Sequence, residues 1–245
     1  MDNYEELLGK LMEKLAEPNQ TQPPILSSAQ KIPVGISNRH IHLSQIDVEK
    51  LFGYGYQLTK LKDLSQPGQF ACKETVMVCG PRGAIEKVRI LGPVRKKTQV
   101  EILQSDSFKL GVKAPLRLSG DLAGSGNVTL IGPKGSAEIV EGTIVAKRHI
   151  HMLPHEATQF GVRDGESVTI EFSGERGGTL ANVIIRAVEN SGLECHIDTE
   201  EANALGITPN TEIVIKKITY RILGGNYNEI RCTRNDRDKR INWFN

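Results

Sequence analysis

The sequence lacks several features by which whole classes of protein are recognised. Its 245 residues contain no apolar run near the ~20 residues of a membrane-spanning helix, and no secretory signal is visible. The formal net charge is only +2, which predicts binding neither to nucleic acid nor to a membrane. No CxxC pair and no dense cysteine framework is present, which favours a reducing, intracellular compartment. The cysteines are Cys72, Cys79, Cys195 and Cys232.

Histidine is also scarce, and four of the six histidines fall in two copies of one tetrapeptide. Arg39-His40-Ile41-His42 returns as Arg148-His149-Ile150-His151, 109 positions later. In a helix, positions i and i+2 would point about 200° apart, whereas in a strand they share a face about 6.6 Å apart. One such pair is as consistent with a surface histidine pair as with a metal site. The repetition in matching contexts favours two metal half-sites.

From Ile32 onwards, short β-like runs alternate with glycine-containing turns. The turns GPRG at 80–83 and GPKG at 132–135 each lie between such runs and predict hairpins. Further strands are predicted at 168–172, 182–188, 194–197 and 212–218. A short helix is predicted after each RHIH segment, from Ser44 to Gly53 and from Pro154 to Gly161, and a third over 200–206. These elements predict a mainly β fold of two similar small β-barrels capped by short helices, which arose by internal duplication.

Residues 1–17 form a separate unit. Apolar side chains recur at three- and four-residue steps and predict an amphipathic helix of about four turns. They are Tyr4, Leu7, Leu8, Leu11, Met12 and Leu15. A linker with proline and glutamine follows over 18–30. The apolar face of the helix docks either on the protein's own barrels or in the groove of a partner. The mixed charge of its polar face makes membrane association the weaker interpretation.

Several longer stretches resemble one known family. They are GISNRHIHLS, LTKLKDLSQPGQFACKETV, GPRGAIEKVRILGPVRKKTQVEI, APLRLSGDLAGS and AKRHIHM. Over about residues 32–218 the chain resembles the PduL-type phosphotransacylases, the phosphate propanoyltransferases, which interconvert acyl-CoA plus phosphate with acyl phosphate plus CoA. The resemblance implies two β-barrels, one formed by 31–38 plus 147–218 and the other by 39–146. Both HxH pairs would then lie at the seam between them. Residues 1–30 and a C-terminal extension, 219–245, lie outside these domains.

The resemblance also implies site residues. Two zinc ions would bind per chain, one at His40, His42 and Glu101 and the other at His149, His151 and His196. Without the family resemblance, Glu101 would be interpreted as a solvent-exposed carboxylate on a strand. Arg95 is implied as the catalytic, phosphate-binding residue, because a guanidinium forks onto phosphate oxygens. Coenzyme A contacts are implied at Ile36, Ser37, Asn38, Arg82, Arg89 and Asn203. His155 is predicted to lie on the surface, Ser119 to line the site, and Cys195 to face away from His196.

The implied chemistry is a thiol transfer. A free thiol has a pKa of about 8.5, and the thiolate is the better nucleophile and zinc ligand. We therefore expect zinc in the first set to hold the CoA sulfur as a thiolate. The second ion would polarise the acyl carbonyl or hold phosphate and water. Acetyl and propanoyl differ by one methylene, about 1–3 kcal/mol in a pocket, so the sequence leaves the acyl group open.

Two functions of other classes stay open at this point. A dizinc hydrolase of a thioester or phosphoester would use the same histidines. Such an enzyme would normally require more Asp or Glu side chains to bridge its two zinc ions. A non-catalytic β-barrel module with a structural zinc is the other. The resemblance further implies a location in the bacterial cytoplasm, inside a microcompartment of the kind used in propanediol degradation. Residues 1–17 would there bind shell or core proteins. Homo-oligomerisation is left open.

Overall fold

The computed structural model describes residues 30–216, so the predictions for helix 1–17, most of the linker and the C-terminal extension lie outside the described residues. The strands are β1 (Ile32–Ser37), β2 (His40–His42), β3 (Lys60–Asp63), β4 (Phe70–Gly80), β5 (Gly83–Gly92), β6 (Gln99–Glu101), β7 (Leu116–Arg117), β8 (Gly126–Ile131), β9 (Ser136–Ala146), β10 (His149–Met152), β11 (Ser167–Phe172), β12 (Gly178–Ala187), β13 (Glu194–Asp198) and β14 (Glu212–Lys216). The helices are α2 (Gln45–Phe52), α3 (Gln104–Leu110), α4 (Pro154–Phe160) and α5 (Thr199–Leu205).

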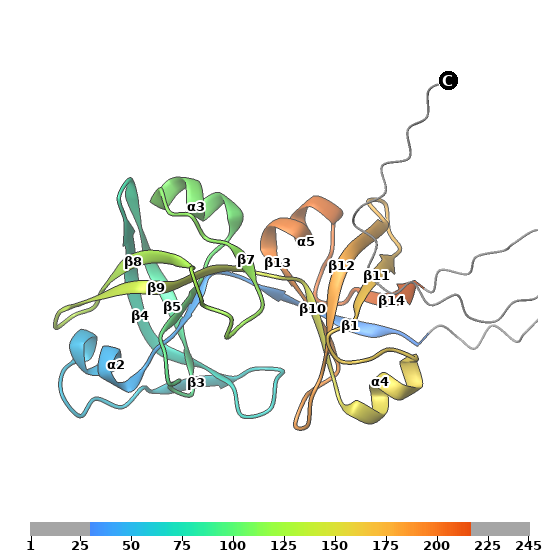
Figure 1. Ribbon diagram of the computed structural model, residues 1–245, viewed down its shortest axis with the longest axis horizontal. Helices are drawn as coiled ribbons and strands as arrows, with labels where there is room; N and C mark the ends of the chain where they lie inside the picture. The colour runs from blue at the N-terminus through green and yellow to red at the C-terminus, as the bar shows by residue number, and fades with distance from the viewer. Residues whose placement is uncertain (1–29, 217–245) are drawn as a thin grey trace, which may run out of the picture.

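These strands form two closed barrels that lie side by side (Figure 1). In the first barrel the strands follow the order β4-β5-β2-β6-β9-β8, and β8 closes it by pairing with both β9 and β4. In the second barrel the order is β1-β13-β10-β12-β11-β14, closed by β14 pairing with β1. The prediction of a mainly β fold with two small barrels is confirmed.

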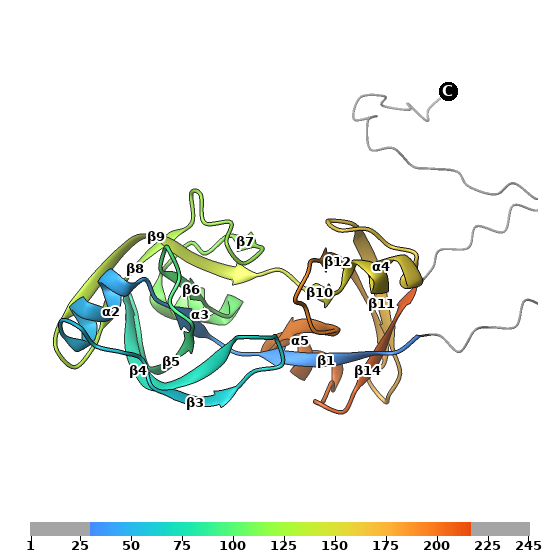
Figure 2. The same ribbon diagram turned by 90° about the horizontal axis from the view of Figure 1, so that it is seen from below.

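The chain crosses between the two barrels after β1 and again after β9 (Figure 2). Strand β1 pairs with β13 and β14 of the second barrel, and the chain then continues into β2 of the first. Strand β9 pairs with β6 and β8 of the first barrel, and the chain then continues into β10 of the second. Each HxH strand is therefore preceded by a strand that belongs to the opposite barrel.

Local sequence explains most of the element boundaries. Ser44 caps α2 by accepting the backbone N–H of Asp47, and Gly53 ends the helix. Pro154 begins α4, and Gly161 ends it in the left-handed conformation at φ 67°. The two predicted Gly-Pro turns connect β4 to β5 and β8 to β9. These helix and hairpin predictions are confirmed.

Three elements were not predicted. Helix α3 starts after Leu103, which has no capping side chain; the Asp106 carboxylate instead accepts the Leu103 N–H at 3.0 Å. Strand β3 is exposed at all four of its residues, so it has no apolar alternation. Strand β7 has only two residues. Elements this short or this polar carry no periodic signal.

Each barrel has its own hydrophobic core, built from alternate residues of its strands. Ile41 of β2 and Ile150 of β10, the isoleucines inside the two HxH motifs, are fully buried in the first and second core respectively. Their burial turns the flanking histidines toward the opposite face of the strand. Within residues 30–216, none of the helices is long and apolar enough to cross a membrane.

Candidate active site between the two barrels

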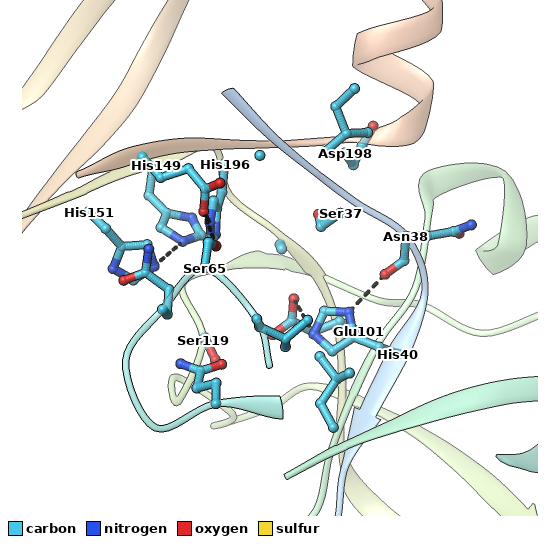
Figure 3. Close-up of a pocket in the computed structure, with 18 of the residues that line it drawn as sticks. Ser37, Asn38, His40, Ser65, Glu101, Ser119, His149, His151, His196 and Asp198 are labelled. Carbon is cyan, nitrogen blue, oxygen red and sulfur yellow. Dashed lines mark hydrogen bonds and ion pairs between the residues drawn. The ribbon is translucent and has the colours of Figure 1, made fainter. Parts of the chain in front are cut away.

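A cavity of about 770 Å³ opens where the two barrels meet. All six predicted metal ligands line it, together with Arg95 and Ser119. They form two groups, which we call the first cluster (His40, His42 and Glu101) and the second cluster (His149, His151 and His196). Within each cluster the candidate donor atoms lie within 4.8 Å of one another. Figure 3 shows His40 and Glu101 of the first cluster and all three histidines of the second cluster around one space, near Ser37 and Asn38 of the segment that crosses between the barrels.

The two clusters occupy equivalent backbone positions. On antiparallel neighbours of the HxH strands, Glu101 of β6 lies opposite His40, and His196 of β13 lies opposite His149. The first histidine of each motif also has the same outer partner. His40 Nδ1 lies 2.8 Å from the Asn38 carbonyl, and His149 Nδ1 lies 2.8 Å from the Lys147 carbonyl. Since a carbonyl accepts the Nδ1–H, each of these rings presents its Nε2 lone pair to its cluster.

In the first cluster, burial and neighbouring charges shift the pKa values of His40 and Glu101 in opposite directions. Burial alone would lower the pKa of His40, but the Glu101 carboxylate 3.4 Å from its Nε2 raises it. Burial alone would raise the pKa of Glu101, but the charge and hydrogen bond of His40 hold it well below its usual range. Burial, with the positive charges of His40 and Arg95, lowers the pKa of His42 to about 3. The cluster thus combines a buried anion with imidazole donors.

Two imidazoles of the second cluster, those of His149 and His151, resist protonation. Burial and the charge of His196 lower the pKa of His149 to about 4. Burial and the charges of His149 and His196 lower the pKa of His151 to about 3. The Nε2 atoms of His149 and His151 lie 3.1 Å apart. Unprotonated imidazoles converging in this way are a donor set for a divalent cation.

Polar side chains two positions before the third member hold each cluster in place. In the first, Gln99 donates from Nε2 to Glu101 Oε1 at 2.5 Å and to Ser119 Oγ at 2.8 Å. In the second, Glu194 Oε2 lies 2.5 Å from His196 Nε2 and also accepts a hydrogen bond from Ser65 of the first barrel. Sequence reasoning missed both residues. The signal was available, because residues i and i+2 of a strand share a face.

Arg95 lies on the β5–β6 connection, which is fixed to the start of α2. Its backbone N–H donates to the Leu43 carbonyl at 2.8 Å. Its guanidinium donates from Nη1 to Ser119 Oγ at 3.0 Å, and Nη2 lies 2.9 Å from His42 Nε2. The guanidinium therefore lies at the edge of the first cluster and faces the cavity.

The residues proposed to contact coenzyme A are not all brought together. Ile36, Ser37, Asn38 and Arg89 line the cavity, whereas Arg82 and Asn203 do not. Arg82 lies at the tip of the β4–β5 hairpin against Gly111, and Asn203 is exposed on α5. Arg89 donates to the carbonyls of Cys72 at 3.0 Å and Lys73 at 2.8 Å.

The remaining histidine and the buried thiols lie away from the clusters. His155 is exposed on α4, as predicted. Cys72 and Cys195 are fully buried in the two barrel cores, which raises the pKa of their thiols to about 11 and about 12. Neither belongs to a cluster, so the prediction that Cys195 faces away from His196 is confirmed.

Comparison with known proteins gives a consistent result. The sequence profile of the family described as phosphate propanoyltransferase matches residues 33–208. A phosphate propanoyltransferase of Rhodobacter capsulatus is 48% identical over 212 residues, which cover 86% of this chain and 96% of the relative. One of Thermotoga maritima is 52% identical over 195 residues, which cover 79% of this chain and 91% of the relative. One of Listeria monocytogenes is 44% identical over 201 residues, covering 82% and 91%.

Proposed function

The chain belongs to the phosphate propanoyltransferase family, and from that premise we propose that it transfers a propanoyl or acetyl group between coenzyme A and phosphate in the cavity between the two barrels. The observation that carries the proposal is the convergence of two donor clusters and the Arg95 guanidinium on one cavity. A cavity of about 770 Å³ is of the size that takes a substrate rather than a lone ion.

We propose one zinc ion in each cluster. Imidazole and carboxylate are zinc ligands, and three protein donors per site leave a position open for substrate. The carbonyls that hold the Nδ1–H groups of His40 and His149 are the outer partners that zinc-binding histidines normally have. Bound zinc would supply Lewis acidity and stabilise a thiolate at neutral pH.

The reaction must balance as acyl-CoA plus hydrogen phosphate giving acyl phosphate plus CoA thiol. A phosphate oxygen forms the new bond to the acyl carbon, the carbon–sulfur bond breaks, and the proton of hydrogen phosphate passes to sulfur. In this proposal Arg95 binds phosphate through its cavity-facing donors and orients it toward the acyl carbon. Ser119 holds the Arg95 guanidinium and Gln99 holds Glu101, so both groups are fixed before substrate binds.

Coenzyme A is proposed to enter beside the segment where the chain crosses from β1 to β2. Ile36, Ser37 and Asn38 line the cavity there, and Arg89 lies on the neighbouring strand opposite His40. Arg82 and Asn203 lie outside the cavity, so we assign them to the nucleotide portion of CoA that extends beyond it.

A thiol-release assay tests the proposal. Purified protein is given propanoyl-CoA or acetyl-CoA with and without phosphate, and free CoA and acyl phosphate are both measured. Phosphate-dependent release with equal amounts of the two products is expected. Phosphate-independent release would instead identify a dizinc hydrolase, and no reaction would identify a binding module. The ratio of kcat/KM for the two substrates would identify the preferred acyl group.

We further propose that the protein works inside a bacterial microcompartment. The support is the amphipathic pattern of residues 1–17, which includes Leu7, Leu8, Leu11 and Leu15 and precedes a proline-containing linker. Deleting residues 1–20 should leave phosphate-dependent activity nearly intact and abolish co-sedimentation with shell proteins. A truncated protein that melts several degrees lower yet still enters shells would contradict the proposal and indicate docking on the barrels.

A further inference from the structure

Five arginines line the cavity, and they differ in how their charges are compensated. They are Arg39, Arg89, Arg95, Arg148 and Arg186. Arg39 pairs with Asp106 at 2.7 Å, and Arg148 pairs with Glu201. The carbonyl oxygens of β4 hold Arg89, and Ser119 and His42 hold Arg95. Four of the five guanidiniums are therefore bonded to protein groups.

The fifth, Arg186, has no such partner in the part of the chain that the structure describes. It lies on β12 of the second barrel, directly opposite His151 on the parallel neighbour β10. Its side chain is half-buried and lines the cavity. Across residues 30–216, no hydrogen bond or ion pair engages its guanidinium. No group of the described residues takes any of its five N–H donors, and its half-buried position partly excludes water.

Arg95 and Arg186 line the same cavity from opposite barrels, Arg95 on the β5–β6 connection and Arg186 on β12. Because both side chains carry a positive charge, they repel each other across the cavity. An anion bound between them would relieve that repulsion.

We propose that Arg186 is a second phosphate-binding residue. It binds phosphate, or the phosphoryl group of acyl phosphate, from the side of the cavity opposite Arg95. The inference rests on the proposed transferase function. Ser119 already accepts one of the five N–H groups of Arg95, so part of the Arg95 donor set is used within the protein before phosphate binds. Phosphate carries several acceptor oxygens and about two negative charges, so it matches two guanidiniums better than one.

The experiment compares the holoenzyme with Arg186→Ala and Arg186→Lys. Initial rates of thiol release are measured while phosphate is varied at saturating acyl-CoA, and then while acyl-CoA is varied at saturating phosphate. We expect Arg186→Ala to raise the KM for phosphate by about ten- to a hundred-fold, the range for losing a hydrogen bond between charged groups. The KM for acyl-CoA should change less than about twofold. Arg186→Lys should recover only part of the loss, because an ammonium keeps the charge without the planar fork.

A second readout is independent of turnover. Phosphate should raise the melting temperature of the wild type, since a ligand that binds only the folded state stabilises it. This shift should disappear in Arg186→Ala at the same phosphate concentration. Arg163, which is exposed on the α4–β11 turn of the same barrel, provides the matched control. Arg163→Ala removes one positive charge outside the cavity and should keep both the kinetic constants and the phosphate shift.

Each outcome decides the matter. An unchanged KM for phosphate in Arg186→Ala would overturn the inference while leaving the transferase function in place. A rise confined to the KM for acyl-CoA would also overturn it, since Arg186 would then bind a phosphate of CoA. If Arg186→Ala does not fold, Arg186→Lys decides: a raised phosphate KM supports the inference and a wild-type KM refutes it. A wild type without phosphate-dependent thiol release would instead refute the proposed function itself.

Discussion

Gly35 of β1 lies directly beneath the second cluster, and we predict that an added methyl group there will disturb that cluster alone. Gly35 pairs with His196 across the parallel β1–β13 ladder. A Cβ at position 35 would lie 2.7 Å from Glu194 Cδ and 2.8 Å from His196 Cδ2. Both neighbours are held, because Glu194 is bonded to His196 and also to Ser65 of the other barrel.

The size of the effect follows from these distances. Carbon atoms pack at about 3.5–4.0 Å, so the Gly35→Ala methyl must push the His196 ring away by roughly 0.7 Å or more. Binding sites tolerate only about 0.5 Å of such displacement. We therefore expect the metal affinity of the second cluster to fall about 10- to 100-fold, as when an orienting partner of a ligand is lost. Overpacking of this kind should also cost about 1–3 kcal/mol of folding stability.

The assay is a calorimetric zinc titration of metal-stripped protein, followed by kinetics of the reloaded enzyme. Wild type should show two tight sites per chain and Gly35→Ala one tight and one weakened site. Gly178→Ala is the matched control, because Gly178 lies in β12 of the same barrel and a Cβ there meets nothing within 4 Å. Two sites of wild-type affinity in Gly35→Ala, with unchanged turnover, would refute the reasoning. Equal losses at both sites would refute the assignment of Gly35 to the second cluster.

Three further predictions concern Arg95, the cluster histidines and Asp47 in the first turn of α2. Arg95→Ala should raise the KM for phosphate and lower kcat while metal content persists; Arg95→Lys should rescue it poorly, and equal kinetics for lysine and arginine would contradict the bidentate role. His40→Ala should empty the first cluster and His149→Ala the second by elemental analysis, whereas one ion or none in active wild type would exclude the two-site arrangement. Asp47 is nearly buried; burial alone would raise the pKa of its carboxyl, but hydrogen bonds from Thr98 and Ser44 lower it. A pKa below the unfolded value of about 3.9 stabilises the fold above that pH, and this contribution is lost as pH falls through the folded pKa. The unfolding free energy of Asp47→Asn should therefore fall less steeply below about pH 4 than that of wild type, and parallel curves would contradict this.

Features encoded over a few consecutive residues could be predicted from the sequence. Ser44, Pro154 and the Gly-Pro turns act through contacts within four residues, so their effects on the helices and hairpins are local. The alternation in His40-Ile41-His42 likewise predicts that the histidines and Ile41 face opposite sides of a strand. The buried Ile41 confirms this.

Features that depend on long-range pairing could not be predicted from periodicity. Nothing local shows that β1 leaves its neighbour β2 to join the second barrel; only the family resemblance implied that exchange. Arg186 and Glu194 each lie within or next to a predicted strand, and their importance depends on what lies across the seam. The i, i+2 spacing places Glu194 on the same strand face as His196, but only the tertiary structure shows that Ser65 of the other barrel also bonds to Glu194.

The exchange of strands has a consequence for both clusters, because each crossing segment touches one cluster and then the other. Strand β1 pairs with His196 of the second cluster at Gly35, and the carbonyl of Asn38 then holds His40 of the first. Strand β9 pairs with Glu101 of the first cluster at Ile144, and the carbonyl of Lys147 then holds His149 of the second. In both segments the two contacts lie three positions apart, so the duplicated units are matched in spacing as well as in topology. Neither cluster is supported by one continuous unit of sequence, because each receives one contact from each of the two crossing segments.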